Sequence, residues 1–184
     1  MQPVGLFQMR LFMDIDQFFA QSEGLWFSQR SCYHLATQQH DNGKADLTVA
    51  CLPVAEPRVA QLGDRAQVPR ATLWGGVEMS WDTSKQDWNR PKQGGSTLLV
   101  LAPQDERRGQ LLRQEGSTVV TGDYQVNADD SLTLRATLAG DRQLEERLWF
   151  ASDNLRLRIS TLRQGSTFEQ VAFYSEIRRL PPKA

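Results

Sequence analysis

The length and composition of this chain are those of one globular domain. It has 184 residues, of which 40% are hydrophobic and 23% are charged, and its net charge is −1 at pH 7, so no basic field predicts nucleic-acid binding. The longest apolar run, residues 96–102, is too short to cross a bilayer, and no pattern predicts a signal peptide. Two cysteines, Cys32 and Cys51, make no disulfide framework and fit a reducing compartment. We therefore expect a cytoplasmic location.

A short amphipathic helix is predicted over residues 15–23. Asp14 offers an N-cap, and Gln17 is its capping-box partner three residues later. The apolar stripe consists of residues at helical spacing: Ile15, Phe18, Phe19 and Ser22. Gly24 can end the helix, and we expect the stripe to cap an opening or pack on a sheet. Residues 1–12 show no clean period and are predicted to be a poorly ordered extension.

Strand periodicity begins at Leu25. Over residues 25–35 neither face is purely apolar, which suits a strand lining a partly polar cavity. Asp41-Asn42-Gly43 predicts a hairpin turn, with residues 45–52 as the partner strand. The stretch 53–70 breaks the pattern and predicts a short helix with Pro57 near its start.

Further strands recur at short spacing, between turns rich in Gly, Asp, Asn, Ser and Pro. The predicted ranges are 73–81, 96–102, 109–114, 118–126, 132–138, 145–150, 155–162 and 167–178. Gly75-Gly76 indicates a bulge or a tight bend, and residues 82–95 a loop.

The pattern therefore predicts an all-β fold with minor α content. Ten antiparallel strands and one N-terminal helix favour an up-and-down barrel of the lipocalin or calycin kind, which encloses one small ligand. A jelly roll is the structural alternative. The domain is expected to span residues 13–180, followed by a tail at 181–184.

The stretch from Leu144 to Arg158 predicts a hairpin with a charged face. Residues 151–154 have turn chemistry, and alternation places Arg156, Arg158 and Ser160 on one face of the second strand. With Glu146 on the neighbouring strand, the two guanidinium groups can clamp a ligand that carries two carboxylates. The alternative is a solvated face of an antiparallel sheet.

Six segments, spread in order from about Met13 to Arg178, carry a family resemblance. They are Phe18-Phe19 with 22–30 (Ser-Glu-Gly-Leu-Trp-Phe-Ser-Gln-Arg), 79–83 (Met-Ser-Trp-Asp-Thr), 95–97 (Gly-Ser-Thr), 145–152 (Glu-Glu-Arg-Leu-Trp-Phe-Ala-Ser), 154–158 (Asn-Leu-Arg-Leu-Arg) and 175–178 (Ser-Glu-Ile-Arg). Through them the chain resembles the S/U-type (CpcS/CpeS-like) phycobilin lyases, which deliver linear tetrapyrroles to phycobiliproteins. That family typically starts near Met13, and it often has paired histidines where Tyr33 and His34 stand here.

The resemblance implies both a fold and an activity. The fold is a ten-stranded lipocalin-like barrel with an N-terminal helix. The activity is binding of a free bilin, phycocyanobilin or phycoerythrobilin, and promotion of its thioether attachment to a cysteine of an apo-phycobiliprotein subunit. No other cofactor is expected. The implied partners are the bilin, the apo-subunit, and either a second copy or a paralogous lyase, in the cytoplasm or, in an alga, the plastid stroma.

The resemblance also assigns roles to individual residues. Arg156 and Arg158 match positions that contact the bilin propionates, and Ser160 shares their face. Glu146 and Glu176 match functional acidic positions, and the pattern alone would also allow an exposed strand Glu or a partner of the two arginines. We expect one or both to face the pyrrole nitrogens and act in catalysis, where a buried carboxylate can stabilise or supply a proton.

Four further residues are predicted around the bilin. Trp81 and Met79 share a strand face and would form the pocket wall, or else ordinary core. Trp26 and Arg30 share the entrance strand, where Arg30 is either a second propionate contact or a structural ion pair. Trp149 lies opposite Glu146 in the alternation, so we expect it in the core or on the outer surface.

The cysteines and histidines predict no metal site. Cys32 and His34 with His40 match no standard zinc spacing. A covalent relay of the bilin through Cys32 is one reading, and an inert small hydrophobic side chain is the preferred one.

Two other functions stay open at this point. The chain is alternatively a non-catalytic bilin carrier or a subunit of a heterodimeric lyase, or else a generic calycin carrier of fatty acids that binds one carboxylate through Arg156 and Arg158.

Overall fold

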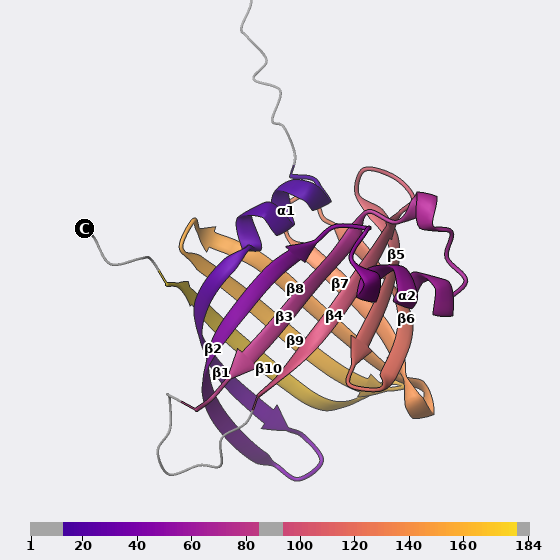
Figure 1. The fold of residues 1–184 in the computed structure, drawn as a ribbon. Coiled ribbons are helices and arrows are strands. Elements are labelled where there is room, and N and C mark those ends of the chain that lie inside the picture. Colours follow the sequence, from indigo (N-terminus) through magenta and orange to yellow (C-terminus); the bar gives the residue numbers. More distant parts are fainter. Residues whose placement is uncertain (1–12, 85–93, 180–184) are drawn as a thin grey trace, which may run out of the picture.

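The computed structural model describes residues 13–84 and 94–179, which form a closed barrel of ten antiparallel strands (Figure 1). Each strand pairs with the next along the chain, and β1 closes the barrel against β10. This arrangement confirms the predicted up-and-down barrel over the jelly roll. No helix in the described ranges is both long and apolar enough to cross a membrane. The predicted extension 1–12 and tail 181–184 lie outside the described residues.

The elements follow the predicted order. The α-helices are α1 (Ile15–Ser22) and α2 (Pro57–Arg65), and the short 3-10 turns are η1 (Arg70–Thr72) and η2 (Ala139–Asp141). The strands are β1 (Gly24–His34), β2 (Gln39–Leu52), β3 (Gly75–Asp82), β4 (Gly94–Pro103), β5 (Arg108–Glu115), β6 (Thr118–Val126), β7 (Leu132–Leu138), β8 (Arg142–Ser152), β9 (Leu155–Gln164) and β10 (Thr167–Arg178).

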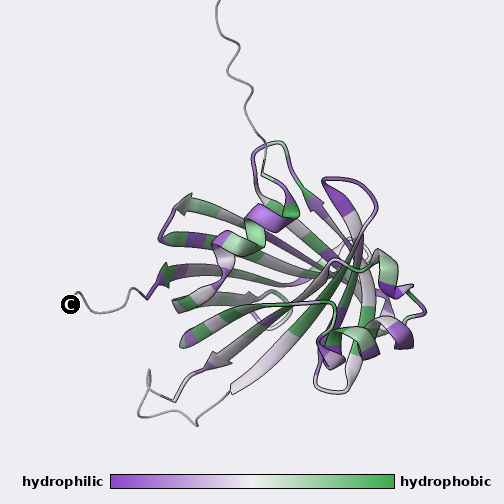
Figure 2. Ribbon diagram, turned by 45° about the horizontal axis from the view of Figure 1, so that its top comes forward, coloured by the Kyte–Doolittle hydropathy of each residue, from purple (hydrophilic) through white to green (hydrophobic). Residues whose placement is uncertain are grey.

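Helix α1 covers one end of the barrel (Figures 1 and 2). The predicted capping box is present: the Asp14 side chain accepts a hydrogen bond from the Gln17 amide at 2.8 Å, and the Gln17 side chain accepts one from the Asp14 amide at 3.1 Å. Phe18 and Phe19 are buried among the interior side chains at this end. The helix therefore closes this end of the barrel, which is the first of the two predicted placements, capping an opening rather than packing on a sheet.

Two apolar clusters occupy opposite faces of the sheet. The interior cluster fills the α1 end of the barrel and includes Trp26, Val77 and Leu101. The second packs α2, through Val59 and Leu62, onto the outer faces of β4 and β5. The interior core stops short of the end opposite α1, where the lining becomes polar.

The glycine pair 75–76 serves close packing rather than a bulge. Both residues keep continuous register with β2 or β4. A Cβ on Gly75 would lie 2.7 Å from the Leu52 carbonyl oxygen, and one on Gly76 would lie 2.7 Å from Val59 Cγ2. Only glycine allows α2 to sit this close to the sheet.

The predicted turn at Asp41-Asn42-Gly43 is wrong. These residues lie inside β2, opposite Cys32, Ser31 and Arg30 of β1, and the turn falls at residues 35–38. Continued pairing of β1 with β10 as far as His34 extends β1 past the expected turn, and Gln38, with φ 54°, supplies the left-handed residue. The β1–β2 hairpin consequently projects beyond the barrel end opposite α1 (Figure 1).

Candidate functional site

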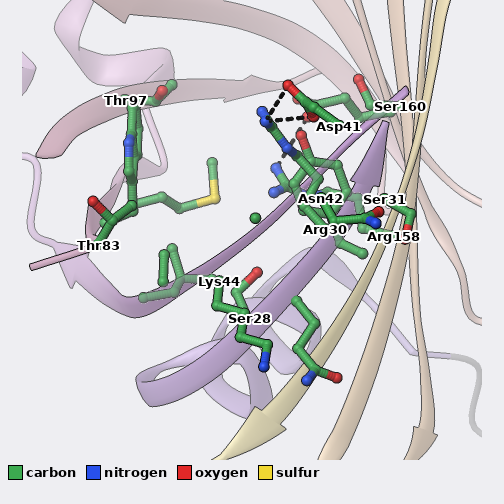
Figure 3. A pocket seen from close by; sticks show the side chains of 18 of the residues that line it. Ser28, Arg30, Ser31, Asp41, Asn42, Lys44, Thr83, Thr97, Arg158 and Ser160 are labelled. Atoms are coloured by element: carbon green, nitrogen blue, oxygen red, sulfur yellow. Dashed lines mark hydrogen bonds and ion pairs between the residues drawn. The ribbon is translucent and has the colours of Figure 1, made fainter. Parts of the chain in front are cut away.

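A cavity of about 930 Å³ lies toward the barrel end opposite α1, where residues of the β1–β2 hairpin line it. Figure 3 shows side chains of the lining. The cavity volume suits one drug-sized ligand. The described residues that line it come from eight strands and the segment after β3: Ser28, Gln29, Arg30, Ser31, Asp41, Asn42, Gly43, Lys44, Ala45, Leu47, Met79, Trp81, Thr83, Thr97, Arg113, Glu115, Leu144, Glu146, Arg158, Ser160 and Tyr174. Four of these side chains are cationic and three are anionic, so the lining favours an anionic ligand.

A chain of ion pairs runs along the inner faces of β10, β9, β8 and β5. Arg156 Nε donates to Glu176 Oε2 at 2.6 Å, and Arg158 Nη2 lies 3.6 Å from Glu176 Oε1. Arg158 Nη1 donates to Glu146 Oε1 at 3.1 Å, and Arg113 binds the other oxygen of Glu146. Because each carboxylate lies between two guanidinium groups, buried charges compensate one another along the wall.

Glu146 is held as a carboxylate. Burial raises the cost of its ionisation, but the guanidinium groups of Arg113 and Arg158 outweigh it, and the net effect lowers the pKa of Glu146 below its usual 4.5. An ionised Glu146 suits electrostatic stabilisation of a cationic ligand rather than donation of a proton.

This lowered pKa predicts a pH dependence of stability. A carboxyl whose pKa is lower in the folded chain stabilises the fold above its unfolded pKa, about 4.5, and this contribution is lost as the pH falls through the folded value. We expect the difference in unfolding free energy between wild type and Glu146→Gln to be constant from neutral pH to about 5 and to shrink below it. Urea titrations at a series of pH values measure it. An equal difference at pH 3 and pH 7 would contradict the assignment.

Arg158 presents its guanidinium group at the cavity. It stacks on Tyr174, with its Cζ 3.7 Å from the ring centroid. Its Nε is buried with no hydrogen-bond partner in the described structure, so a donor remains for a ligand or a water.

The structure brings six of the predicted site residues to the cavity wall: Arg30, Met79, Trp81, Glu146, Arg158 and Ser160. Arg156, Glu176 and Trp26 are fully buried and do not line the cavity; they lie behind its wall. The Arg156 guanidinium group packs over the Trp26 ring at 5.1 Å, and Trp26 Nε1 donates to the Ser22 carbonyl at 2.8 Å. These three residues join the cavity wall to the α1 plug. Trp149 lies on the outer face of β8 and is half-buried.

Arg30 forms the ion pair that was one of its two predicted roles, and its place in the cavity lining leaves the other, a propionate contact, open to it. Its Nη2 donates to both oxygens of Asp41, at 2.9 and 3.1 Å (Figure 3), and its side chain also lines the cavity. The pair holds the guanidinium group at the rim.

Arg113, Asp41 and Tyr174 belong to the site but were not predicted. Arg113 follows the buried Leu111 by two residues on β5, so both lie on the same face of the strand. A cation on an otherwise apolar face was the signal that could have identified it. Asp41 was assigned to a turn. Tyr174 lies two residues before Glu176 and therefore shares the inner face of β10 with it. The alternation along this strand could have identified Tyr174.

Cys32 is a poor nucleophile in this setting. Burial and the nearby Asp41 carboxylate raise the pKa of its thiol, against the opposing effect of Arg30, which disfavours the thiolate. Its Sγ lies 3.7 Å from His34 Nε2, whereas His40 pairs with Tyr33, on the other face of the hairpin. The geometry gives no support to a covalent relay.

The closed barrel and its polar cavity define a calycin-type barrel with room for a small ligand. The sequence model of the family described as "CpeS-like protein" matches residues 14–179. The chain belongs to the CpcS/CpeS family of chromophore lyases. This confirms the family and the class of activity predicted from the sequence.

Relatives match almost end to end. The chain is 43% identical over 171 residues to "Chromophore lyase CpcS/CpeS" of Thermosynechococcus vestitus, covering 90% of this chain and 93% of the relative. It is 31% identical to "Phycocyanobilin lyase subunit CpcS" of Picosynechococcus sp., covering 92% and 88%. The solved structure of the S-type phycobiliprotein lyase CPES of Guillardia theta superposes with a TM-score of 0.79 at 26% identity, over 92% of this chain and 94% of that one.

Proposed function

We propose that this chain binds a linear tetrapyrrole in the cavity and promotes its thioether attachment to a cysteine of an apo-phycobiliprotein subunit. The observation that carries the proposal is the alternating wall of Arg113, Glu146 and Arg158 inside a barrel cavity of about 930 Å³. Such a wall offers cations to the bilin propionates and a fixed carboxylate to its pyrrole nitrogens.

Three cations of the cavity lining support the binding of the propionates. Arg158 comes from the wall, and Arg30 and Lys44 come from the projecting hairpin; all three line the cavity. Asp41 fixes Arg30 at the rim, so two separated cationic points are preorganised for a ligand with two carboxylates. Trp81 and Met79 add apolar wall for the tetrapyrrole rings.

Glu146 supplies the electrostatic part of the reaction. The thiol adds across the ethylidene group of ring A: the sulfur bonds to the ethylidene carbon, and the proton ends on the adjacent ring carbon. A protonated tetrapyrrole accepts the nucleophile more readily, and an ionised carboxylate beside the pyrrole nitrogens stabilises that cation. The barrel contributes the rest by holding the bilin in one orientation and shielding its reactive end. Glu176, behind the wall, positions Arg158 in this scheme.

Co-expression with a bilin-producing pathway and candidate apo-subunits tests the proposal. Wild type is expected to yield a subunit that keeps its chromophore fluorescence on a denaturing gel. Bilin that co-purifies with the chain without any covalent transfer would instead indicate a carrier or a partner-dependent subunit. Bilin retention that a fatty acid abolishes equally well, with no transfer, would indicate a generic calycin carrier.

Exposed apolar residues gather on the outer faces of β1, β9 and β10. Those on the three strands that are more than a third exposed are Leu25, Tyr33, Ile159, Phe168, Val171, Phe173 and Ile177. Tyr33 pairs with Val171, and Phe173 pairs with Ile159, so the patch is continuous. Every outward position from 25 to 33, 155 to 161 and 171 to 177 is uncharged. We infer that a second copy of this chain covers the patch, because an apolar face without charge is complementary to itself.

This inference predicts the oligomeric state. Light scattering on a sizing column is expected to give twice the chain mass of 20.9 kDa for wild type and a monomer for Phe173→Glu, which buries a charge at the interface. Thr121→Glu makes the same change on the outer face of β6, where it should leave the dimer intact. A wild-type monomer, or a complex only with a paralogous lyase, would overturn the homodimer.

A further inference from the structure

Three potential metal ligands converge on the inner face of the β1–β2 hairpin. Cys32 and His34 are two residues apart on β1, and the strand register places Asp41 of β2 directly opposite Cys32. Their ligand atoms all lie within 4.8 Å of one another. The spacing of Cys32, His34 and His40 argued against a metal, but the third ligand comes from the neighbouring strand and was hidden by the misplaced turn.

The distances approach those of a tetrahedral site. Cys32 Sγ lies 3.7 Å from His34 Nε2, and His34 Nε2 lies 3.9 Å from Asp41 Oδ2. A tetrahedral Zn²⁺, with bonds of about 2.3 Å to sulfur and about 2.0–2.2 Å to nitrogen and oxygen, separates neighbouring ligand atoms by roughly 3.4–3.6 Å. A contraction of a few tenths of an ångström would bring these two pairs to that separation. The third pair, Cys32 and Asp41, lies within 4.8 Å, and rotation of the two side chains would close it.

The surroundings support the cluster. Cys32 is 3% exposed, so its sulfur is shielded at the base of the site, whereas His34 and Asp41 are half-exposed and open to entry of an ion. Arg30 donates to both oxygens of Asp41, which is how outer partners orient a metal-binding carboxylate. The carboxylate keeps lone pairs for a cation after both hydrogen bonds are made.

We propose that Cys32, His34 and Asp41 bind one thiophilic divalent cation of the Zn²⁺ type, with its fourth position open to water or a ligand. The combination of a thiolate, an imidazole and a carboxylate selects such a cation over Mg²⁺ or Ca²⁺. The site borders the cavity, because Asp41 and Arg30 also line it. A cation there would tie β2 to β1 within the projecting hairpin, next to the place where the bilin and its acceptor thiol must meet.

The chain offers matched controls for a test, because it contains two cysteines and two histidines. We would titrate bilin-free, chelator-treated protein with Co²⁺, whose visible and near-ultraviolet bands report tetrahedral geometry and a thiolate ligand, and with Zn²⁺ by calorimetry. Wild type is expected to bind one equivalent with a thiolate-to-cobalt band. Cys32→Ser should abolish that band, and Cys32→Ser, His34→Ala and Asp41→Asn should each weaken binding at least about tenfold.

Cys51→Ser and His40→Ala should bind as wild type does, since Cys51 lies near α1 and His40 points to the outer face. Far-ultraviolet circular dichroism of each metal-free variant verifies the fold. Absence of binding in wild type, unchanged binding in Cys32→Ser or His34→Ala, or loss of binding in the control variants would overturn the site. The measurement uses no bilin, so its outcome is independent of the lyase proposal.

Discussion

Arg156→Met is expected to lower the free energy of unfolding by about 3–5 kcal/mol, the typical cost of leaving one partner of a buried ion pair behind. Glu176 has no measurable exposure, and the Arg156 guanidinium group is its partner at 2.6 Å. Arg158, 3.6 Å from the other oxygen, is too far away to replace that hydrogen bond. The Glu176 carboxylate would therefore be left buried without a cation within hydrogen-bond distance.

A double variant separates the effect of removing the whole ion pair from the effect of leaving one buried charge without its partner. Arg156→Met/Glu176→Met removes both charges and keeps apolar volume, so we expect its stability to return to within about 1 kcal/mol of wild type or above it. Arg163→Met, on the exposed outer face of the same strand, should change stability by less than about 0.5 kcal/mol. Urea unfolding at neutral pH measures all four proteins. A double variant as unstable as Arg156→Met would show that the ion pair contributes net stability beyond neutralising its own two charges.

Period-two alternation was sufficient to predict which residues face the barrel interior. Arg156, Arg158 and Ser160 do share the inner face. The alternative of a solvated face is wrong for them, because the solvent-facing side of a closed barrel is its outer face and these residues lie on the inner one. The same alternation says nothing of depth along the barrel axis. Depth depends on the stagger between strands and on where α1 plugs the end, and both are long-range. Arg156 and Arg158 therefore looked equivalent, although only Arg158 reaches the cavity.

The misplaced turn has a similar cause. Asp41-Asn42-Gly43 is a strong local signal, but pairing of β1 on both sides, with β10 and β2, outweighs it. Arg113 was missed because its partner, Glu146, lies three strands away along the wall and 33 residues away along the chain. Local patterns thus predict elements and faces, while ion pairs across the barrel emerge only from the register.

The difference in depth predicts that Arg158, rather than Arg156, dominates bilin binding. Its guanidinium group lines the cavity and has a buried Nε without a hydrogen-bond partner in the described structure. Loss of a charged contact to a bound carboxylate costs about 2–5 kcal/mol, or roughly 30- to 5,000-fold in affinity. We expect Arg158→Ala to lower bilin affinity and the yield of covalently labelled apo-subunit by this order.

Arg163→Ala is the matched control, because Arg163 is an exposed arginine on the outer face of the same strand and should leave both quantities unchanged. Arg158→Ala also leaves Glu146 with Arg113 and Glu176 with Arg156, so each carboxylate keeps one cation and the barrel should still fold, as thermal unfolding would verify. Absorbance titration with free bilin isolates binding from transfer. If folded Arg158→Ala binds bilin as wild type does while Arg156→Met/Glu176→Met does not, the inner pair rather than the cavity wall recognises the propionates, and the bilin lies deeper in the barrel than proposed.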